Sequence, residues 1–292
     1  MEEQTKTGTL YLVATPLGNS GDMSPRASEV LQAADYIAAE DTRRAARLLS
    51  SLGVGNRLVS YYEQNKEYRH DMLLADLKAG QSIAVISDAG MPCISDPGEA
   101  LVRLAIQKGI PVSVIPGPSA LLSALAASGL DTSRFAYEGF FPVKGKPRSL
   151  RLEAVAAEPR TLVFYEAPHR LRKTLDDLSK QGMDPRRLAV AREMTKTYEE
   201  FLYFTVAEAR GYYEKVDPKG EFTLVMEGLD EFRSRSGWKP EEDWPDGKLR
   251  DLLREAFDQG MKTREAAGQV AKETGVSRKR LYELALGLDK TS

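Results

Sequence analysis

The fold is decided by residues 82–98, Ser82-Ile-Ala-Val-Ile-Ser-Asp-Ala-Gly-Met-Pro-Cys-Ile-Ser-Asp-Pro-Gly98. The stretch begins with a continuous apolar run, which is typical of a strand buried on both faces of a parallel sheet. The Gly- and Pro-containing turn that follows permits a ligand to approach the backbone closely. Asp96-Pro97-Gly98 then begins a helix. A strand, a turn and a helix in this order predict an α/β protein.

The residues around this stretch repeat the alternation of strands and helices, which predicts crossover connections and a mainly parallel sheet. We expect an N-terminal tail over residues 1–8 and a first α/β domain over 9–131. Its other strands are expected at 9–15, 35–39, 57–62 and 112–115, and its other helices after Ser24-Pro25, at 42–52 and at 68–78.

Residues 132–228 predict a second α/β domain. Strands are expected at 135–141, 161–165, 187–193, 201–206 and 221–227, and helices at 150–157, 168–180 and 206–215. Because some of these strands follow one another without a helix between them, the sheet should be mixed. The polar residues 229–246, with two prolines, are expected to form a linker.

Residues 247–292 predict a helix-turn-helix-like helical domain. Helices are expected at 248–257, 263–273 and 277–286, with Gly275-Val276-Ser277 as the turn and Ser277 as a cap. Arg278, Lys279 and Arg280 begin the last helix, where nucleic-acid phosphates would lie. A small structural bundle or a dimerisation element is an equally good interpretation.

The composition places limits on location and partners. The 292 residues carry a net charge of −2, so any polyanion has to be bound by a local basic patch. One such patch is the loop 143–151, with Lys144, Lys146, Arg148 and Arg151, although a solvated face is the simpler interpretation. The single cysteine, Cys93, the polar N-terminus and the lack of a long apolar run lead us to expect a cytoplasmic protein.

Several common chemistries have no motif in this sequence. It contains neither the G-x-G-x-x-G dinucleotide motif after the first strand nor the G-x-x-x-x-G-K-[ST] phosphate loop. No G-x-S-x-G elbow supports a serine nucleophile. His70, His169 and Cys93 lack metal-ligand spacing, so no metal is expected, and Cys93 is interpreted as a packing residue.

Turns with Gly and Pro follow three of the predicted strands, at residues 15–19, 87–92 and 116–120. In an open parallel sheet, ligands bind beyond the carboxyl ends of the strands, so these turns predict a small-molecule cleft. Two polar clusters, Glu40-Asp41-Thr42-Arg43 and Tyr165-Glu166-Ala167-Pro168-His169-Arg170, also follow strands. Each cluster is interpreted either as part of the site or as a helix cap.

Taken together, residues 12–19, 39–43, 87–97, 116–120 and 165–170 resemble the tetrapyrrole methylase superfamily, and the resemblance covers 8–228. It implies two α/β domains of the tetrapyrrole methylase type, with S-adenosylmethionine in the cleft between them, and a homodimer. The cofactor-binding residues that it implies are Pro16, Leu17, Gly18, Asp88, Ala89, Gly90, Ile94, Ser119, Ala120, Tyr165, Glu221, Phe222 and Thr223.

Within the superfamily, the resemblance is to enzymes that methylate the ribose 2′-hydroxyl of a decoding-centre cytidine in 16S rRNA, presented by the small ribosomal subunit. Our hypothesis is that Asp41, Glu166 or His169 takes the hydroxyl proton, while Arg43 and Arg170 hold a phosphate or the ribose. Catalysis by alignment alone is the alternative. Both basic patches would bind RNA backbone.

Two other functions remain open from the sequence. A corrin or sirohaem carbon methyltransferase would share the fold without needing the basic loop or the C-terminal helices. A nucleotide-sensing regulator would bind DNA through those helices and catalyse nothing.

Overall fold

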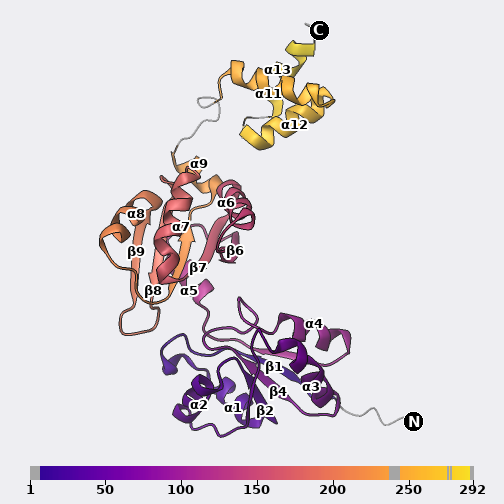
Figure 1. Ribbon diagram of the computed structural model, residues 1–292, viewed down its shortest axis with the longest axis vertical. Helices are drawn as coiled ribbons and strands as arrows, with labels where there is room; N and C mark the ends of the chain where they lie inside the picture. The colour runs from indigo at the N-terminus through magenta and orange to yellow at the C-terminus, as the bar shows by residue number, and fades with distance from the viewer. Residues whose placement is uncertain (1–6, 237–243, 275, 277, 290–292) are drawn as a thin grey trace, which may run out of the picture. The chain divides into compact units, whose positions relative to one another are not determined.

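A computed structural model describes residues 7–236, 244–274, 276 and 278–289. The chain divides into two compact units, Met1–Leu229 and Asp230–Ser292. The first unit contains the two predicted α/β domains, each built around its own five-stranded sheet (Figure 1).

The first sheet is parallel throughout, as predicted. Its strands lie in the order β3-β2-β4-β1-β5. Their bounds are β1 (Leu10–Val13), β2 (Tyr36–Ala39), β3 (Leu58–Ser60), β4 (Ile83–Ile86) and β5 (Val112–Ile115).

Helices cover both faces of this sheet. The short helix η1 (Ser20–Asp22) precedes α1 (Pro25–Ala33), α2 (Thr42–Ser51), α3 (Lys66–Lys78) and α4 (Glu99–Gln107). Side chains of a strand point alternately to the two faces. Accordingly, Ile37 of β2 packs with α1 and α2, whereas Ala38 packs with α3 and α4. Burial on both faces is the reason why these strands contain continuous apolar runs.

The second sheet is mixed, also as predicted, in the order β6-β7-β10-β8-β9. Only β6 and β7 are parallel neighbours, and the other pairs are antiparallel. The strands are β6 (Phe135–Phe140), β7 (Thr161–Glu166), β8 (Arg187–Arg192), β9 (Glu200–Thr205) and β10 (Phe222–Met226).

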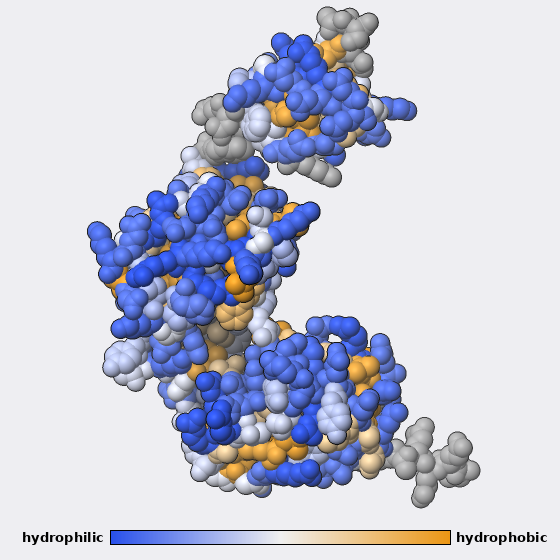
Figure 2. All heavy atoms as spheres, viewed as in Figure 1, coloured by the Kyte–Doolittle hydropathy of each residue, from blue (hydrophilic) through white to orange (hydrophobic). Residues whose placement is uncertain are grey.

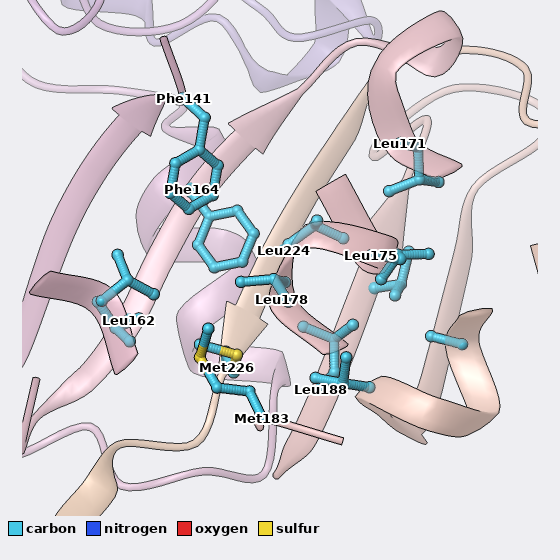
Figure 3. Packing of buried hydrophobic residues seen from close by; sticks show 14 of the residues in the cluster. Phe141, Leu162, Phe164, Leu171, Leu175, Leu178, Met183, Leu188, Leu224 and Met226 are labelled. Atoms are coloured by element: carbon cyan, nitrogen blue, oxygen red, sulfur yellow. The ribbon is translucent and has the colours of Figure 1, made fainter. Parts of the chain in front are cut away.

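One face of this sheet is covered by α6 (Lys146–Ala157), α7 (Pro168–Lys180) and α8 (Val206–Lys215). Figure 3 shows the core beneath them, where Leu171, Leu175 and Leu178 of α7 pack near Phe164 and Leu224. These leucines recur at helical spacing, so a single stripe of α7 is buried.

Helix α5 (Ala120–Ala127) covers the other face of the second sheet. Ala124 and Leu125 pack against Val163 of β7 and Val225 of β10. The predicted boundary at residue 131 placed this helix with the first domain, whereas its buried residues pack against the second sheet. The helix directly follows β5 in the chain, but its apolar face is buried against the second sheet.

The predicted linker 229–246 is partly helical, because α9 (Leu229–Ser236) lies within it. Asp230 and Glu231 in its first turn, with Arg233 and Arg235 in its last, complement the helix dipole. The rest of the linker at 237–243 and the tail at 1–6 lie outside the described residues.

The C-terminal unit contains α11 (Asp246–Asp258), α12 (Thr263–Thr274) and α13 (Arg278–Asp289) around a small core of its own. Leu249 and Leu253 of α11 pack with Val270 of α12 and Leu281 of α13. The predicted turn residue Gly275 and cap Ser277 lie outside the described residues. Throughout the described part of the chain, no helix has the length and apolar character needed to cross a membrane.

Candidate cofactor site and active site

The strand-end turns meet because β2, β4, β1 and β5 are neighbours in the first sheet. The turns after β1 and β4 are joined by two backbone hydrogen bonds, from Thr15 N–H to the Gly90 carbonyl (2.9 Å) and from Gly90 N–H to the Thr15 carbonyl (3.0 Å). Gly90 has a φ of +81°, and a Cβ there would lie 3.2 Å from the Leu17 side chain. The position therefore requires glycine, and the backbone stays open toward a ligand.

These turns border a cavity of about 390 Å³ in the first unit, lined by residues of both α/β domains. Its volume falls in the range of small-molecule sites. The structure brings together around it most of the residues that the family resemblance implied: Leu17, Asp88, Ala89, Gly90, Ile94, Ser119, Ala120, Tyr165, Glu221, Phe222 and Thr223. Pro16 and Gly18 are not among its lining residues, and Gly18 instead lies against the side chain of Lys196.

Hydroxyl groups connect the two domains beside this cavity. Ser95 Oγ lies 2.7 Å from the hydroxyl of Tyr137 on β6, and the Tyr137 ring packs edge-on against the Tyr165 ring on β7, with 5.3 Å between the ring centroids. The backbone N–H of Leu121 donates to the Tyr165 hydroxyl at 3.2 Å. Burial raises the pKa of both tyrosines, so they remain neutral hydrogen-bonding groups.

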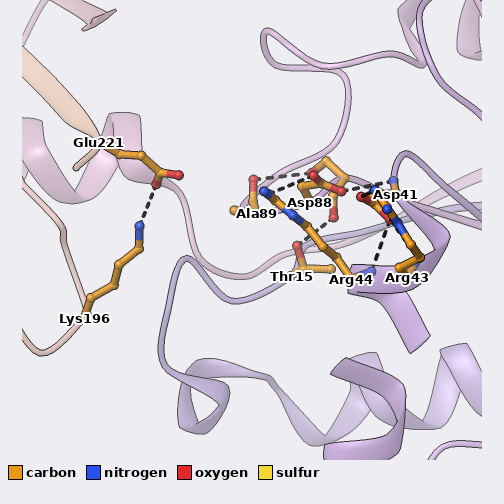
Figure 4. Close-up of polar contacts among 9 residues, drawn as sticks. Thr15, Asp41, Arg43, Arg44, Asp88, Ala89, Lys196 and Glu221 are labelled. Atoms are coloured by element: carbon orange, nitrogen blue, oxygen red, sulfur yellow. Dashed lines mark hydrogen bonds and ion pairs between the residues drawn. The ribbon is translucent and has the colours of Figure 1, made fainter. Parts of the chain in front are cut away.

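An ion pair marks the part of the wall formed by the second domain. The ammonium of Lys196 bonds to Glu221 at 2.9 Å (Figure 4). It also bonds to Glu193 at 2.9 Å. Since Lys196 also contacts Gly18, its stem packs against the turn after β1. A Cβ on Gly18 would clash with this stem, which accounts for glycine at that position.

Three carboxylates of the first domain also line the cavity, namely Glu40 after β2, Asp88 after β4, and Asp96. Asp88 is paired with Arg44 at 3.0 Å and accepts the Asp41 N–H at 3.1 Å (Figure 4). Burial raises the pKa of Asp96 to about 6, and burial together with the Asp88 charge raises the pKa of Glu40. Glu40 and Asp96 therefore line the cavity without a paired cation in the described part of the chain, whereas Asp88 is paired with Arg44.

Glu40 belongs to one of the two polar clusters predicted after strands, but no role was predicted for Glu40, Arg44 or Asp96. Asp96 was interpreted as the beginning of a helix, although it stands two residues after Ile94, which the resemblance implied to be a cofactor contact. Its loop is shaped by Cys93 and Ser95, which have φ values of 71° and 64°. Positive φ outside glycine has no reliable sequence signal, so the direction of the loop was not predictable.

Cys93 behaves as the packing residue that was predicted. Its sulfur would lie 2.5 Å from a Cβ on Gly98, so the two residues fit tightly together. Burial raises the pKa of the Cys93 thiol to about 11, which disfavours the reactive thiolate.

Asp41 and Arg43 bind each other in the structure. Asp41 caps α2 by accepting the Arg43 N–H at 2.8 Å, and its carboxylate pairs with the Arg43 guanidinium at 2.9 Å. These bonds from Arg43 hold the pKa of Asp41 far below its usual range. Asp41 is not among the residues that line the cavity. The helix-cap interpretation of this residue is the one that the geometry favours.

Glu166 and Arg170 are likewise held inside the second domain. The fully buried Glu166 carboxylate accepts hydrogen bonds from the Ala167 N–H (2.9 Å) and the Thr174 hydroxyl, and it pairs with Arg170 at 3.3 Å. Arg170 also donates to the Phe141 carbonyl. His169 is exposed and does not belong to the cavity lining. Glu166 is one of the residues that line the cavity, whereas Arg170 is not, and the Glu166 carboxylate is bonded within the second domain.

Arg148 is buried and does not belong to an RNA-binding surface, so the predicted basic loop presents fewer cations than expected. It is 4% exposed and donates to Asp177 (2.7 Å), to the Pro142 carbonyl (3.0 Å) and to the Thr174 hydroxyl (3.0 Å). Residues from 146 onward form the first turns of α6, and this places Arg148 on its buried face. Lys144 and Lys146 are exposed, while Arg151 pairs with Glu138 at 2.7 Å.

In the C-terminal unit, exposed Arg278 and Lys279 border a groove of about 480 Å³ together with Arg264 and Tyr282. Figure 2 shows that the viewed face of these helices is covered mainly by hydrophilic side chains. Arg280, which was predicted to bind RNA with them, instead pairs with Asp246 at 2.6 Å. Arg264 and Tyr282 were not predicted, because the sequence does not show that α12 and α13 present them to one groove.

No group of three or more His, Cys, Asp and Glu side chains able to hold a metal ion occurs among residues 7–236, 244–274, 276 and 278–289.

Comparison with known families decides the relationship. Residues 9–210 match the tetrapyrrole (corrin/porphyrin) methylases, and residues 241–289 match the RsmI C-terminal HTH domain. The chain belongs to the tetrapyrrole methylase family. The first match covers the first α/β domain and most of the second, and the other covers the C-terminal helices.

Curated relatives match almost the whole chain. It is 46% identical over 282 residues to ribosomal RNA small subunit methyltransferase I of Synechocystis sp., with 97% of this chain and 99% of the relative covered. It is 43% identical over 281 residues to the protein of the same name from Escherichia coli O157:H7, with 96% and 95% covered.

Solved structures share the fold at low sequence identity. Uroporphyrin-III C-methyltransferase from Thermus thermophilus, complexed with S-adenosylhomocysteine, superposes with a TM-score of 0.56 at 22% identity, covering 75% of this chain and 97% of that one. A diphthine synthase gives a TM-score of 0.60 at 14% identity, covering 82% and 98%. At these identities the likeness shows the fold alone.

Proposed function

We propose that this chain transfers a methyl group from S-adenosylmethionine to the ribose 2′-hydroxyl of a cytidine in 16S rRNA. The observation that carries the proposal is the likeness over almost the full length, C-terminal helices included, to proteins named ribosomal RNA small subunit methyltransferase I. A carbon methyltransferase of tetrapyrroles would share the α/β domains, but it has no need of the C-terminal helices.

The cavity suits S-adenosylmethionine in size and in chemistry. The glycine at position 90 leaves the backbone of the 88–90 turn open to the ligand, where a larger residue would press on Leu17. The carboxylates of Glu40 and Asp96 provide negative charge for a cationic ligand. When bound, S-adenosylmethionine supplies a methyl group made electrophilic by the sulfonium charge.

The chain's own residues would then align the reactants. Ser119 and Ala120 place the N-terminus of α5 at the cavity, and the N–H groups of a helix N-terminus favour an anionic group such as the ligand carboxylate. Tyr165 is fixed by Leu121 and Tyr137, so its ring forms a rigid wall. Alignment of this kind reduces the entropic part of the barrier.

RNA would be bound by exposed cations that do not line this cavity. Arg264, Arg278 and Lys279 border the groove of the C-terminal unit, and Lys144 and Lys146 are exposed near the start of α6. Such residues contact phosphates and position the RNA, and they do not read its sequence.

The test uses small ribosomal subunits from cells that lack this protein. Purified protein and radiolabelled S-adenosylmethionine should place label on the RNA, and nuclease digestion with mass analysis should identify 2′-O-methylcytidine. Label on a carbon of a tetrapyrrole would instead support the tetrapyrrole substrate. Sequence-specific binding of duplex DNA without methyl transfer would support the regulator.

The homodimer and the cytoplasmic location implied earlier stay predictions. Light scattering of the purified protein should give twice the mass of the 292-residue chain. A single-chain mass at micromolar concentration would contradict the dimer.

A further inference from the structure

We propose that Asp96 is the catalytic carboxylate that takes the proton of the attacking hydroxyl group during methyl transfer. This inference rests on the proposed function, since it assigns a step within that reaction. It replaces Asp41, Glu166 and His169, which the sequence suggested for this role.

The position of Asp96 supports the role. It lies between β4 and α4, half-buried, and lines the cavity at the level where both α/β domains contribute side chains. Next to it in the chain, Ser95 bonds to Tyr137 of the second domain. A substrate group that enters the cavity can therefore meet Asp96 as well as the cofactor.

Among the described residues, the titratable groups that face the Asp96 carboxylate are acids and neutral side chains, and none of them is a cation. Glu40 and Asp88 face it from the ends of β2 and β4, Cys93 from its own loop, and Tyr137 and Tyr165 from the second sheet. The nearby Arg44 is paired with Asp88. Within the part of the chain that the structure describes, no lysine or arginine forms an ion pair with Asp96. Its lone pairs are thus available to accept a proton.

The other candidates are already occupied. Asp41 is the ionised cap of α2 and is bound by Arg43, so its affinity for a proton is very low. Glu166 is fully buried and bound by Ala167, Thr174 and Arg170. Among the carboxylates that line the cavity, Asp88 is paired with Arg44 and Glu221 with Lys196. Glu40 accepts the backbone N–H of Asp88 and remains the comparison residue for the test.

The acidity of Asp96 suits a general base. Burial raises its pKa to about 6, and the neighbouring Glu40 charge acts in the same direction. A base works best when its pKa lies close to the working pH, because it is then mostly ionised and still holds a proton well.

The ribose oxygen forms a bond to the methyl carbon with one of its lone pairs. The carbon–sulfur bond breaks and leaves its electron pair on sulfur, so the sulfonium becomes a neutral thioether. The oxygen–hydrogen bond breaks toward oxygen, and the proton passes to the Asp96 carboxylate, which later releases it to water.

The first test compares Asp96→Asn with Glu99→Gln in single-turnover methyl transfer to small subunits. Glu99 begins α4 three residues later, is 75% exposed and pairs with Arg103, so its variant removes a carboxylate from outside the cavity. We expect Asp96→Asn to lower the rate at least about a hundredfold, as loss of a general base does. Glu99→Gln should keep the wild-type rate.

The pH profile separates a proton acceptor from a structural residue. The wild-type rate should rise with pH and level off above about 6, since the base acts only when it is ionised. In Asp96→Asn this rise of the rate with pH should be absent. The proposal would be overturned if Asp96→Asn kept both the wild-type rate and the rise of the rate with pH. If that rise were lost in Glu40→Gln alone, the role would belong to Glu40.

A binding measurement supplies the readout that does not depend on turnover. Calorimetry should give similar affinities of wild type and Asp96→Asn for S-adenosylhomocysteine. A large loss of affinity would mean that Asp96 holds the cofactor and would overturn its role as a base. If Asp96→Asn fails to fold, Glu40→Gln replaces it. Removing the Glu40 charge, which raises the pKa of Asp96, should move the rise of the rate to lower pH, and an unmoved rise would contradict the proposal.

The two failures are distinguishable. If wild-type protein transfers no methyl group to small subunits, the proposed function fails. If wild type transfers it and Asp96→Asn does so equally well, only the role of Asp96 fails.

Discussion

At the scale of single residues, burial decides whether a charged side chain can bind a partner. Arg148 and Lys144 belong to the same basic run, yet Arg148 is bound inside the second domain by Asp177, Thr174 and a backbone carbonyl, whereas Lys144 is exposed. The partner Asp177 is 29 residues away in the chain, on a different helix. No local pattern in the sequence indicates such a pair.

Arg148→Ala should therefore destabilise the fold rather than act on RNA directly. Removing one partner of a buried ion pair leaves the other desolvated and unpaired, which costs about 3 kcal/mol or more. Urea unfolding should show this loss in the free energy of unfolding. Lys144→Ala, from the same run, should change it by less than about 0.5 kcal/mol. Equal effects of the two substitutions would contradict the burial of Arg148.

Asp96 offers a second prediction at this scale. Burial raises its pKa in the folded state, so the folded protein binds this proton more tightly than the unfolded chain does. The stabilisation of the folded state by this proton is fully present below the unfolded-state pKa of Asp96, and it is lost as the pH rises through about 6. Asp96→Asn should thus melt no lower than wild type at about pH 8, where the wild-type carboxylate is ionised at a cost. A clear fall in Tm there would mean that the ionised carboxylate stabilises the fold.

At the scale of elements, the strands and their carboxyl-terminal turns were the most predictable part of the protein. Continuous apolar runs identify buried strands, and Gly and Pro mark where they end, so the turns after β1, β4 and β5 could be assigned to one edge. The packing partner of a helix was less predictable. Helix α5 follows a strand of the first sheet but covers the second, and nothing in its apolar face distinguishes the two.

The beginning of α5 connects stability to cofactor binding. The Ser119 side chain caps this helix by accepting the Leu122 N–H, and Ser119 lines the cavity. Ser119→Ala should lower stability by about 1 kcal/mol, as loss of a helix cap does. It should also weaken S-adenosylhomocysteine binding in calorimetry. Ser24→Ala, which removes the cap of α1, should lower stability alone. Unchanged affinity in Ser119→Ala would separate α5 from the cofactor site.

At the scale of the whole molecule, the cavity proposed for the cofactor and the groove bordered by Arg264, Arg278 and Lys279 belong to different compact units. The cofactor cavity lies within Met1–Leu229, and the helices of Asp230–Ser292 have a core of their own. The sequence predicted this division from the polar composition of residues 229–246. Which cations stay exposed could not be predicted from the sequence. Arg280, for example, pairs with Asp246 of another helix.

Deleting residues 247–292 should weaken binding to small subunits and reduce its dependence on salt, because fewer phosphates are neutralised. Affinity for S-adenosylmethionine should stay at the wild-type value. Filter binding over a salt series and calorimetry measure the two quantities. Equal loss of both would mean that the C-terminal helices are a structural appendage.

The paired backbone bonds between Thr15 and Gly90 have a consequence for the thermodynamics of ligand binding. They tie two loops that would otherwise fluctuate independently, so this wall is ordered before a ligand arrives and loses little conformational entropy on binding. In hydrogen exchange, the amides of Thr15 and Gly90 should already be protected in the free protein, and cofactor should slow them only slightly. Most of the ordering on binding would then fall on parts of the cavity wall other than these two turns.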